Sequence, residues 1–390
     1  MSVEYKRGLE DIVAATSSIC TVDGAAGKLR YRGYDIDDLA QRSSFEEVTS
    51  LLWFGDLPKK ADLDRFSREL AGGRALQAPV LDAMQAYPRK VHPLEAIRTA
   101  VSFHAMYDPD AHDNSADANL RKSVRLTAQM ATFVAAWRRI REGKPVVAPD
   151  AADGGHSHAW NFLYMNSGQA PDALSEEAMN KVLVLHAEHE LNASTFAARV
   201  AVATVSDLHS ALVGALGTLK GPRHGGANED VLQMLQEIKT PERAEPYIKG
   251  KLAAFENMSR TERADPKNRI PGFGHRVYKV DDARAPHLRA IGRRLAERAG
   301  VLNVAETAEA VYRVMHAETK LPVNVDFFSA VIYHSLAIPI DLCTSIFAVS
   351  RMPGWCAHIM EQYADNRLIR PRAEYTGVGP RPFVPIEARG

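Results

Sequence analysis

The sequence contains little cysteine, and this scarcity excludes two classes of protein. Among 390 residues there are three cysteines, Cys20, Cys343 and Cys356, and they lie far apart. An odd number of widely spaced cysteines provides neither a disulfide framework nor the paired spacing of a structural zinc site. We therefore expect a protein of a reducing compartment and predict a cytoplasmic location.

The chain also lacks net charge, a long apolar run and the features of a leader. Its 48 basic and 48 acidic residues cancel, so no overall field attracts it to nucleic acid or to an anionic membrane. The most apolar region, 330–350, is interrupted by His334, Pro339 and Asp341, which are costly in lipid. The opening MSVEYKRGLEDIV has acids and no apolar core of the kind that a signal peptide needs. We expect neither nucleic acid nor a membrane as a partner, and any anionic ligand must be held by local arginines.

Helical periodicity is what the sequence has in abundance. With 46% hydrophobic and 25% charged residues, the composition is that of a globular protein with a sizeable core. Apolar residues recur at helical spacing over 118–140, where Gly143 and Pro145 end the run, and over 194–219. Further helices are predicted from an N-cap at Ser175 into the region 186–190, from Thr240 and Pro241, and from Asp281 or Asp282 to about Gly300.

Strand signals are few. The best hairpin candidate is ICTVDGAAGKLRYRGYDI at 19–36, in which two short β-rich runs flank a glycine-rich turn. The segment PVVAPDAADGGH at 145–156 is typical of an exposed loop. The residues therefore predict a mainly α protein with a small N-terminal β element.

The stretch LHAEHELNAS at 185–194 is the first candidate site. It places His186, His189 and Glu190 at i, i+3 and i+4 spacing, so on a helix they would share one face and could hold a metal. The order of residues is not the HExxH of zinc peptidases. A solvated or hydrogen-bonded histidine face is the alternative, and the residues alone favour it.

Two glycine-rich stretches each carry a histidine. In GTLKGPRHGGANED at 217–230, Gly225 and Gly226 leave the backbone bare beside His224, so a ligand could reach the imidazole and free N–H groups. A plain helix–turn–helix corner explains these glycines equally well. In NRIPGFGHRVYK at 268–279, main-chain groups near His275 could read a flat ring while the surrounding cations meet phosphates. A generic basic loop is the alternative, and neither stretch matches a Walker A or Rossmann pattern.

Charged residues inside apolar segments are the last candidates. Asp326 lies in LPVNVDFFSAVIYH at an expected helix start, where it is either an N-cap or a desolvated carboxylate of raised basicity. Arg351 lies among hydrophobic residues in VSRMPGWCAH, a position that calls for an anion. Arg367, Arg370 and Arg372 follow near the C-terminus.

Six of these segments, in this order, resemble the citrate synthase family across essentially the whole chain. They are RYRGYDI at 30–36, HAEHELNASTF at 186–196, GPRHGGANE at 221–229, PGFGHRVY at 271–278, NVDFFSA at 324–330 and IRPRAEYTG at 369–377. The resemblance implies a mostly helical homodimer of two-domain subunits. It implies a large domain of residues 1–225 and 338–390 and a small mobile domain of residues 226–337 that closes over the substrates.

The resemblance also implies an activity and its residues. Members condense acetyl-CoA with oxaloacetate and hydrolyse citryl-CoA, without a metal or a redox cofactor. By likeness to the family motifs, Asp326 is the general base, His224 donates to the thioester oxygen, and His275 polarises the ketone of oxaloacetate. The implied oxaloacetate ligands are His189, Arg284, Arg351 and Arg370, the last reaching in from the partner subunit, with Arg372 as its neighbour across a proline. The implied CoA ligands are Arg269, Ile270, Pro271, Gly272 and Phe273, with Lys279 as a phosphate ligand.

Two departures and three alternatives accompany the resemblance. The longer N-terminal region of the NADH-regulated members is absent, so we expect no NADH allostery, and the lack of a presequence fits a bacterial or archaeal cytosolic enzyme. The nearest alternative is a 2-methylcitrate synthase, which uses propionyl-CoA with the same catalytic residues. The others are a metal-dependent hydrolase built on His186, His189 and Glu190, and a helical scaffold without catalysis.

Overall fold

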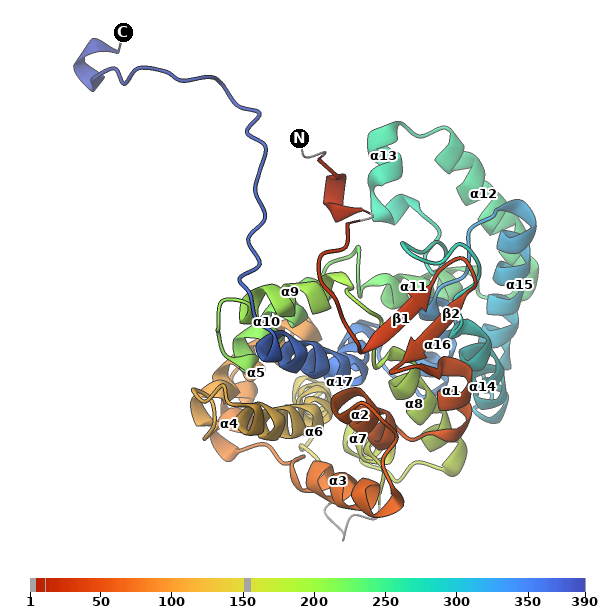
Figure 1. The fold of residues 1–390 in the computed structure, drawn as a ribbon. Coiled ribbons are helices and arrows are strands. Elements are labelled where there is room, and N and C mark those ends of the chain that lie inside the picture. The colour runs from red at the N-terminus through yellow and green to blue at the C-terminus, as the bar shows by residue number, and fades with distance from the viewer. Residues whose placement is uncertain (1–4, 11, 151–155, 390) are drawn as a thin grey trace.

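The computed structural model describes residues 5–10, 12–150 and 156–389, and within these it contains seventeen α-helices and one small sheet (Figure 1). The prediction of a mainly α protein is confirmed. Short 3-10 helices complete the regular structure: η1 (Arg7–Leu9), η2 (Ala105–Tyr107), η3 (Pro241–Arg243), η4 (Pro266–Asn268), η5 (Ile340–Leu342) and η6 (Ile386–Ala388).

The sheet is the hairpin that the sequence predicts, extended by a third strand. Strands β1 (Cys20–Asp23), β2 (Lys28–Tyr31) and β3 (Tyr34–Asp35) run antiparallel in the order β1-β2-β3. The register pairs Cys20 with Tyr31 and Asp23 with Lys28. This register buries Leu29 and Tyr31 on one side of β2. The hydroxyl of Tyr31 donates a hydrogen bond to the backbone carbonyl of Glu188, in the loop of residues 187–192.

The first ten helices span residues 36–219. They are α1 (Ile36–Arg42), α2 (Phe45–Phe54), α3 (Lys60–Gly72), α4 (Ala78–Gln85), α5 (Pro93–His104), α6 (Ala116–Arg141), α7 (His158–Ser167), α8 (Ala173–His186), α9 (Ala193–Val202) and α10 (Leu208–Leu219). The predicted helix at 118–140 is α6, capped by Ser115 and followed by Gly143 in the left-handed region. Its Trp137 is fully buried in the core. Of the expected loop 145–156, residues 151–155 lie outside the described residues, and 145–150 form no helix or strand.

Two helix boundaries differ from the prediction. The N-cap of α8 is Asp172, whose side chain accepts hydrogen bonds from the N–H groups of Leu174 and Ser175, so Ser175 lies inside the helix. The continuous helix expected over 194–219 is two helices, because Asp207 caps α10 by accepting a hydrogen bond from the Ser210 N–H, while Val205 adopts a positive φ of 64°. An aspartate side chain that caps a new helix competes with continuation of the preceding helix, and here the cap forms and the preceding helix ends.

The remaining helices are α11 (Ala227–Ile238), α12 (Ala244–Glu256), α13 (Arg260–Ala264), α14 (Ala285–Arg298), α15 (Leu302–Glu318), α16 (Val325–Ser335) and α17 (Cys343–Ala364). Thr240 does not cap with its side chain, and Pro241 opens η3. Neither Asp281 nor Asp282 is the N-cap of α14, which starts after Arg284; Gly300 does follow its end, as predicted. Helix α16 packs on α11 and α14, and α17 packs on α6, α8 and α9.

The C-terminal segment after α17 runs away from the helical body (Figure 1). Within the described ranges, every helix is too short or too polar to cross a membrane. The expected division into residues 1–225 with 338–390 and residues 226–337, and the movement of the smaller part, stay predictions.

Candidate active site

The histidine motif does not lie on one helix face. Helix α8 ends at His186, residues 187–192 form a loop, and Glu190 adopts a positive φ of 55°. The loop ends where Asn192 caps α9 by accepting a hydrogen bond from the Thr195 N–H at 3.2 Å. The predicted shared face of His186, His189 and Glu190 is therefore wrong, because a capping asparagine needs a non-helical backbone.

The same geometry removes the basis of the metal hypothesis. His186 is fully buried and its Nδ1 lies 2.8 Å from the carbonyl of Val182, so Nδ1 carries the proton and donates. Within the described residues, the groups whose side chains could hold a metal are His104 with Asp108 and His209, and His189 with His275 and Asp282. Neither group contains His186 or Glu190.

His189 turns instead toward the glycine-rich loop at 268–279. Its ring centroid lies 5.2 Å from that of His275, and the His275 ring lies 4.7 Å from Tyr278. His189 is buried, and burial holds the pKa of its imidazole well below its usual range. His189 and His275 are 86 positions apart in the sequence, yet their rings lie side by side next to Tyr278.

His275 has a fixed tautomer. Its Nδ1 accepts hydrogen bonds from the backbone N–H groups of Val277 at 3.0 Å and Tyr278 at 3.1 Å. Burial, assisted by the nearby Arg284, lowers the pKa of His275 to about 4. The ring is thus neutral near pH 7, and its proton is on Nε2 as a hydrogen-bond donor.

His224 lies on the turn between α10 and α11, beside Ser194 at the start of α9. Its Nε2 is 2.8 Å from the Ser194 hydroxyl and accepts from the Ser194 N–H at 3.4 Å. With Nε2 accepting, the neutral ring carries its proton on Nδ1. Burial lowers the pKa of His224 to about 4, so this second imidazole is also a neutral donor.

Asp326 is buried at the start of α16, and it is not the helix cap. Asn324 caps the helix by accepting from the Asp326 N–H at 3.1 Å. The carboxyl Oδ1 has no hydrogen-bond partner within the described part of the chain. Burial raises the pKa of Asp326 to about 7, so of the two interpretations of this residue the structure agrees with the desolvated carboxylate of raised basicity.

Arg284 and Arg351 are both buried, but their surroundings differ. Arg284 forms a paired salt bridge with Asp282, with Nε–Oδ1 at 2.8 Å and Nη2–Oδ2 at 2.6 Å. Arg351 donates from Nε to the carbonyl of His186 at 2.6 Å, and among the described residues its Nη1 finds no acceptor. A buried guanidinium with a free donor is suited to a carboxylate ligand.

The two arginines connect the catalytic candidates electrostatically. The charge of Arg351 lowers the pKa of His224 and opposes the rise at Asp326, where burial is the main cause of both shifts. Arg284 acts in the same way on His275 and Asp326. Two guanidinium charges therefore act on Asp326, one of them also on His224 and the other also on His275, and both of these imidazoles are neutral.

Arg370 is not brought to this region. It lies on the exposed segment after α17, as does Arg372. Neither side chain contributes to the buried group of this chain, and the choice between them as the ligand from a partner subunit stays a prediction.

The residues of the predicted CoA loop lie in two different surroundings. Arg269, Ile270 and Pro271 line a cavity of about 310 Å³, which Lys251 and Lys267 also border. Gly272 and Phe273 face inward: the Gly272 carbonyl accepts from the Asn324 N–H at 3.0 Å, and Phe273 lies 4.8 Å from the Phe327 ring. Lys279 is exposed and does not border this cavity.

A larger cavity of about 880 Å³ opens between α14 and α15. None of the predicted catalytic, oxaloacetate or CoA residues borders it. Its lining has three arginines and four acids, with an Arg289–Glu309 ion pair among them.

Sequence reasoning missed several residues that hold the site together. Asp282, read as a helix cap, is the partner of Arg284. Ser194 was visible within the motif HAEHELNASTF but had no assigned role, and it receives a hydrogen bond from the Trp355 indole at 3.1 Å. Tyr278 and the pair of Glu188 with His358 were also missed. Glu188, Ser194 and Tyr278 lie within the quoted motifs, and this was the signal that could have pointed to them. Their roles could not be predicted, because His358 and Trp355 come from a distant part of the chain.

Comparison with known proteins gives one consistent family. The family model described as "Citrate synthase, C-terminal domain" matches residues 8–372. Citrate synthase 2 of Bacillus subtilis is 48% identical over 98% of this chain and 99% of its own length. Citrate synthase of Haloferax volcanii is 46% identical over 100% of both chains, and 2-methylcitrate synthase 1 of Corynebacterium glutamicum is 39% identical over 99% of both.

Solved structures agree with this result. Citrate synthase from Pyrobaculum aerophilum superposes with a TM-score of 0.88 at 36% identity, covering 98% of this chain and 95% of the other. A ternary complex of carboxymethyl coenzyme A and oxaloacetate with citrate synthase from Thermoplasma acidophilum gives a TM-score of 0.88 at 32% identity, covering 99% of this chain and 100% of the other. The fold and the relatives define an acyltransferase. The chain belongs to the citrate synthase family, which condenses acetyl-CoA with oxaloacetate.

Proposed function

We propose that the protein condenses acetyl-CoA with oxaloacetate and hydrolyses the resulting citryl-CoA to citrate and CoA through Asp326, His224 and His275. The observations that carry this assignment are the buried carboxyl of Asp326, whose pKa is raised to about 7, and the neutral imidazoles of His224 and His275. The arrangement combines a base with two hydrogen-bond donors in a region of low polarity. Such a set can make one carbon nucleophilic and another electrophilic.

In the first step Asp326 removes a proton from the methyl group of the thioester. A carboxylate is far too weak a base to form a free carbanion, so negative charge must pass to the thioester oxygen as the C–H bond breaks. The Nδ1–H of neutral His224 stabilises that oxygen by donating a hydrogen bond. A neutral donor is suited to this task, because an imidazolium beside Asp326 would lower the basicity of the carboxylate.

In the second step the enolate carbon attacks the ketone of oxaloacetate. The Nε2–H of His275 donates to the ketone oxygen and transfers its proton to that oxygen as the new C–C bond forms, and the ring then regains a proton, which balances the one that Asp326 took from the methyl group. Water then cleaves the citryl thioester, with CoA as the leaving thiol. Proton transfers and hydrogen bonds from the chain's own residues account for the condensation, so the proposal includes no metal or redox cofactor.

Oxaloacetate is a dianion, and the proposed ligands are His189, Arg284, Arg351 and Arg370. Support comes from the free Nη1 donor of buried Arg351 and from the neutral ring of His189. Arg370 is exposed on a segment that leaves the helical body (Figure 1). We propose that it completes the site of a partner subunit in a homodimer, and that the smaller part of each subunit closes over the substrates to exclude water.

For CoA we propose the loop 269–273, with main-chain groups reading the adenine and Lys279 as a weaker phosphate ligand. The cations Lys251, Lys267 and Arg269 outnumber the acids Asp230 and Glu237 around the cavity of about 310 Å³, and this excess of positive charge supports an anionic ligand at this loop. The related Thermoplasma acidophilum enzyme has been solved with carboxymethyl coenzyme A and oxaloacetate. A cytoplasmic location completes the proposal.

Acetyl-CoA is proposed as the preferred thioester, and propionyl-CoA is the second candidate. The second candidate is favoured by relatives named 2-methylcitrate synthase, such as the Corynebacterium glutamicum protein at 39% identity. One extra methylene in an apolar pocket changes specificity by about 1–3 kcal/mol, which a few pocket residues can supply. Measuring kcat/KM for both thioesters by release of the CoA thiol tests the proposal, and a ratio that favours propionyl-CoA overturns the preference. Absence of thiol release with either substrate overturns the function.

A further inference from the structure

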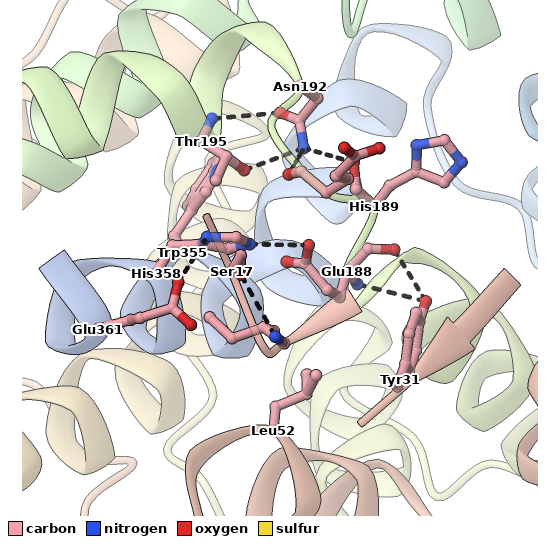
Figure 2. A network of polar contacts seen from close by, with 12 residues as sticks. Ser17, Tyr31, Leu52, Glu188, His189, Asn192, Thr195, Trp355, His358 and Glu361 are labelled. Atoms are coloured by element: carbon pink, nitrogen blue, oxygen red, sulfur yellow. Dashed lines mark hydrogen bonds and ion pairs between the residues drawn. The ribbon is translucent and has the colours of Figure 1, made fainter. Parts of the chain in front are cut away.

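Glu188 is a buried acid next to the proposed oxaloacetate ligand His189, and two contacts hold it in place (Figure 2). Its backbone carbonyl accepts from the Tyr31 hydroxyl at 2.9 Å. Its carboxylate Oε1 lies 3.0 Å from Nε2 of His358 on α17. Figure 2 shows Glu188 between these two partners. The sheet and α17 therefore fix this residue of the loop from opposite sides.

The partner of the carboxylate is a neutral histidine. Nη1 of Arg199 donates to Nδ1 of His358 at 3.0 Å, and a guanidinium can only donate. Nδ1 is therefore an acceptor, and His358 gives its Nε2 proton to Glu188. The charge of Arg199 is matched by Glu361, at 2.6 Å. Because His358 is neutral and Arg199 is already paired, the negative charge of Glu188 is not cancelled within this network.

The cation that faces this charge is Arg351. A Cβ added to Gly354 would lie 2.2 Å from Oε2 of Glu188 and 3.3 Å from Cδ of Arg351, so both side chains pack against the same glycine. Oε2 of Glu188 and Nη1 of Arg351 both lack a hydrogen-bond partner among the described residues, although both side chains are buried. Burial lowers the pKa of Arg351, and Glu188 is the charge that most strongly opposes this fall.

We propose that Glu188 is a positioning residue that serves as the countercharge of Arg351 in the empty pocket and thereby weakens the binding of the oxaloacetate dianion. This inference rests on the proposed function. In the empty protein, Glu188 offsets the cost of keeping a guanidinium away from water. When the dianion arrives, it is attracted by Arg351 and repelled by Glu188, so part of the attraction is lost. The same repulsion acts on citrate, which carries more negative charge, and favours its release.

The substitution Glu188→Gln tests the sign of this effect, since it keeps the shape and an acceptor for His358 while removing the charge. We expect lower thermal stability without ligand. We also expect oxaloacetate to bind about threefold to tenfold more tightly by calorimetry, since the repulsion of a nearby buried charge is removed. Inhibition by citrate should strengthen in parallel. A residue with only a structural role predicts the opposite, because a loosened loop would misplace His189 and weaken binding.

Glu190→Gln is the matched control. It removes the same charge from the same loop at an exposed position, so its affinity for oxaloacetate should equal that of the wild-type protein within about twofold. Unchanged or weaker oxaloacetate binding by Glu188→Gln overturns the proposal. If the wild-type protein binds no oxaloacetate, the proposed function fails and this inference fails with it. If the wild-type protein binds oxaloacetate and catalyses the condensation, but Glu188→Gln does not bind oxaloacetate more tightly, this inference fails while the proposed function stands.

A measurement on the wild-type protein covers the case in which Glu188→Gln does not fold. In protein labelled with ¹⁵N histidine, the His358 ring should show the tautomer protonated on Nε2. Its Nε2 signal should move when oxaloacetate is added, because the field at Glu188 changes. A signal from the Nδ1-protonated tautomer, or one that oxaloacetate does not move, contradicts the proposed coupling.

Discussion

Asn324 and Gly274 are joined by a hydrogen bond of 3.2 Å, from the amide nitrogen of Asn324 to the glycine carbonyl. The same asparagine caps the helix that carries Asp326, and Gly274 directly precedes His275. One side chain thus fixes the helix of the proposed base relative to the loop of the proposed acid. Chemistry that needs both groups within reach of two reactants depends on this connection.

The raised pKa of Asp326 predicts a dependence of activity on pH. The base must be ionised, and its pKa in the protein is about 7. The rate of condensation at saturating oxaloacetate should therefore rise with pH between about pH 6 and pH 8. A rate that stays constant across this range would contradict the assignment of Asp326 as the base.

The same shift predicts a dependence of stability on pH. The pKa of Asp326 is raised from 3.8 to about 7 on folding, so the folded state holds the proton more tightly than the unfolded state. Its contribution to stability is complete below the unfolded pKa and is lost as the pH rises through the folded pKa. At pH 8 the ionised, buried carboxylate costs up to about 4 kcal/mol. Asp326→Asn should therefore be more stable than the wild type at pH 8, with a smaller gain at pH 5, in denaturant unfolding.

Ser194→Ala should slow the reaction without abolishing it. The Ser194 hydroxyl lies 2.8 Å from Nε2 of His224 and accepts from Trp355. Its loss removes a group that fixes the tautomer of His224, which we expect to lower kcat by about tenfold, the effect of losing about 1.4 kcal/mol of transition-state stabilisation. Oxaloacetate affinity, measured by calorimetry, should not change. An unaltered kcat would show that the hydroxyl does not position His224.

Arg351→Lys should weaken oxaloacetate binding while preserving the positive charge. Arg351 uses Nε for the His186 carbonyl and keeps Nη1 for a ligand, and one ammonium group cannot reproduce this fork. We expect KM for oxaloacetate to rise by about tenfold or more, equivalent to the loss of one charged hydrogen bond. An unchanged KM would remove Arg351 from the set of ligands.

Gly272→Ala should destabilise the fold strongly. The glycine has a φ of +82°, and an added Cβ would lie 2.6 Å from Cδ2 of Phe327 and 2.9 Å from Cγ2 of Val231. We expect a loss of about 2–4 kcal/mol in denaturant unfolding, from backbone strain together with overpacking.

Gly274→Ala is the control for this loss. Gly274 has a φ of +88°, but apart from its two chain neighbours no described residue has an atom within 4 Å of an added Cβ. Strain alone should then cost about 1–2 kcal/mol. Equal losses in the two variants would show that contact with Phe327 and Val231 does not matter.

The sequence was sufficient to indicate the helical class, the N-terminal hairpin and the candidates His224, His275 and Asp326. These predictions rest on local patterns and on short motifs whose order is recognisable. It was misleading at 185–194, where helical spacing suggested one face. There Asn192 caps the next helix and Glu190 takes a positive φ, so a local competition between cap and helix decided the structure.

The residue pairs that position the site could not be predicted either, because most of their members are far apart in the sequence. Glu188 and His358 are 170 positions apart, and Ser194 and Trp355 are 161 positions apart. Such pairs depend on how α17 packs against the loop after α8, and the spacing of apolar residues along the sequence does not predict this packing. Asp282 and Arg284 are close in sequence, but the pattern of an aspartate before a helix indicated a cap more readily than a buried salt bridge.

The central claim is that Asp326 acts as the base at a site where His224 and His275 are the donors. It is tested most directly by Asp326→Asn, in which release of the CoA thiol and the affinity for oxaloacetate are measured on one preparation. We predict that turnover falls by about 10²- to 10⁴-fold, the usual contribution of a general base, while oxaloacetate binds within about threefold of the wild-type affinity. Turnover close to that of the wild-type protein would contradict the account.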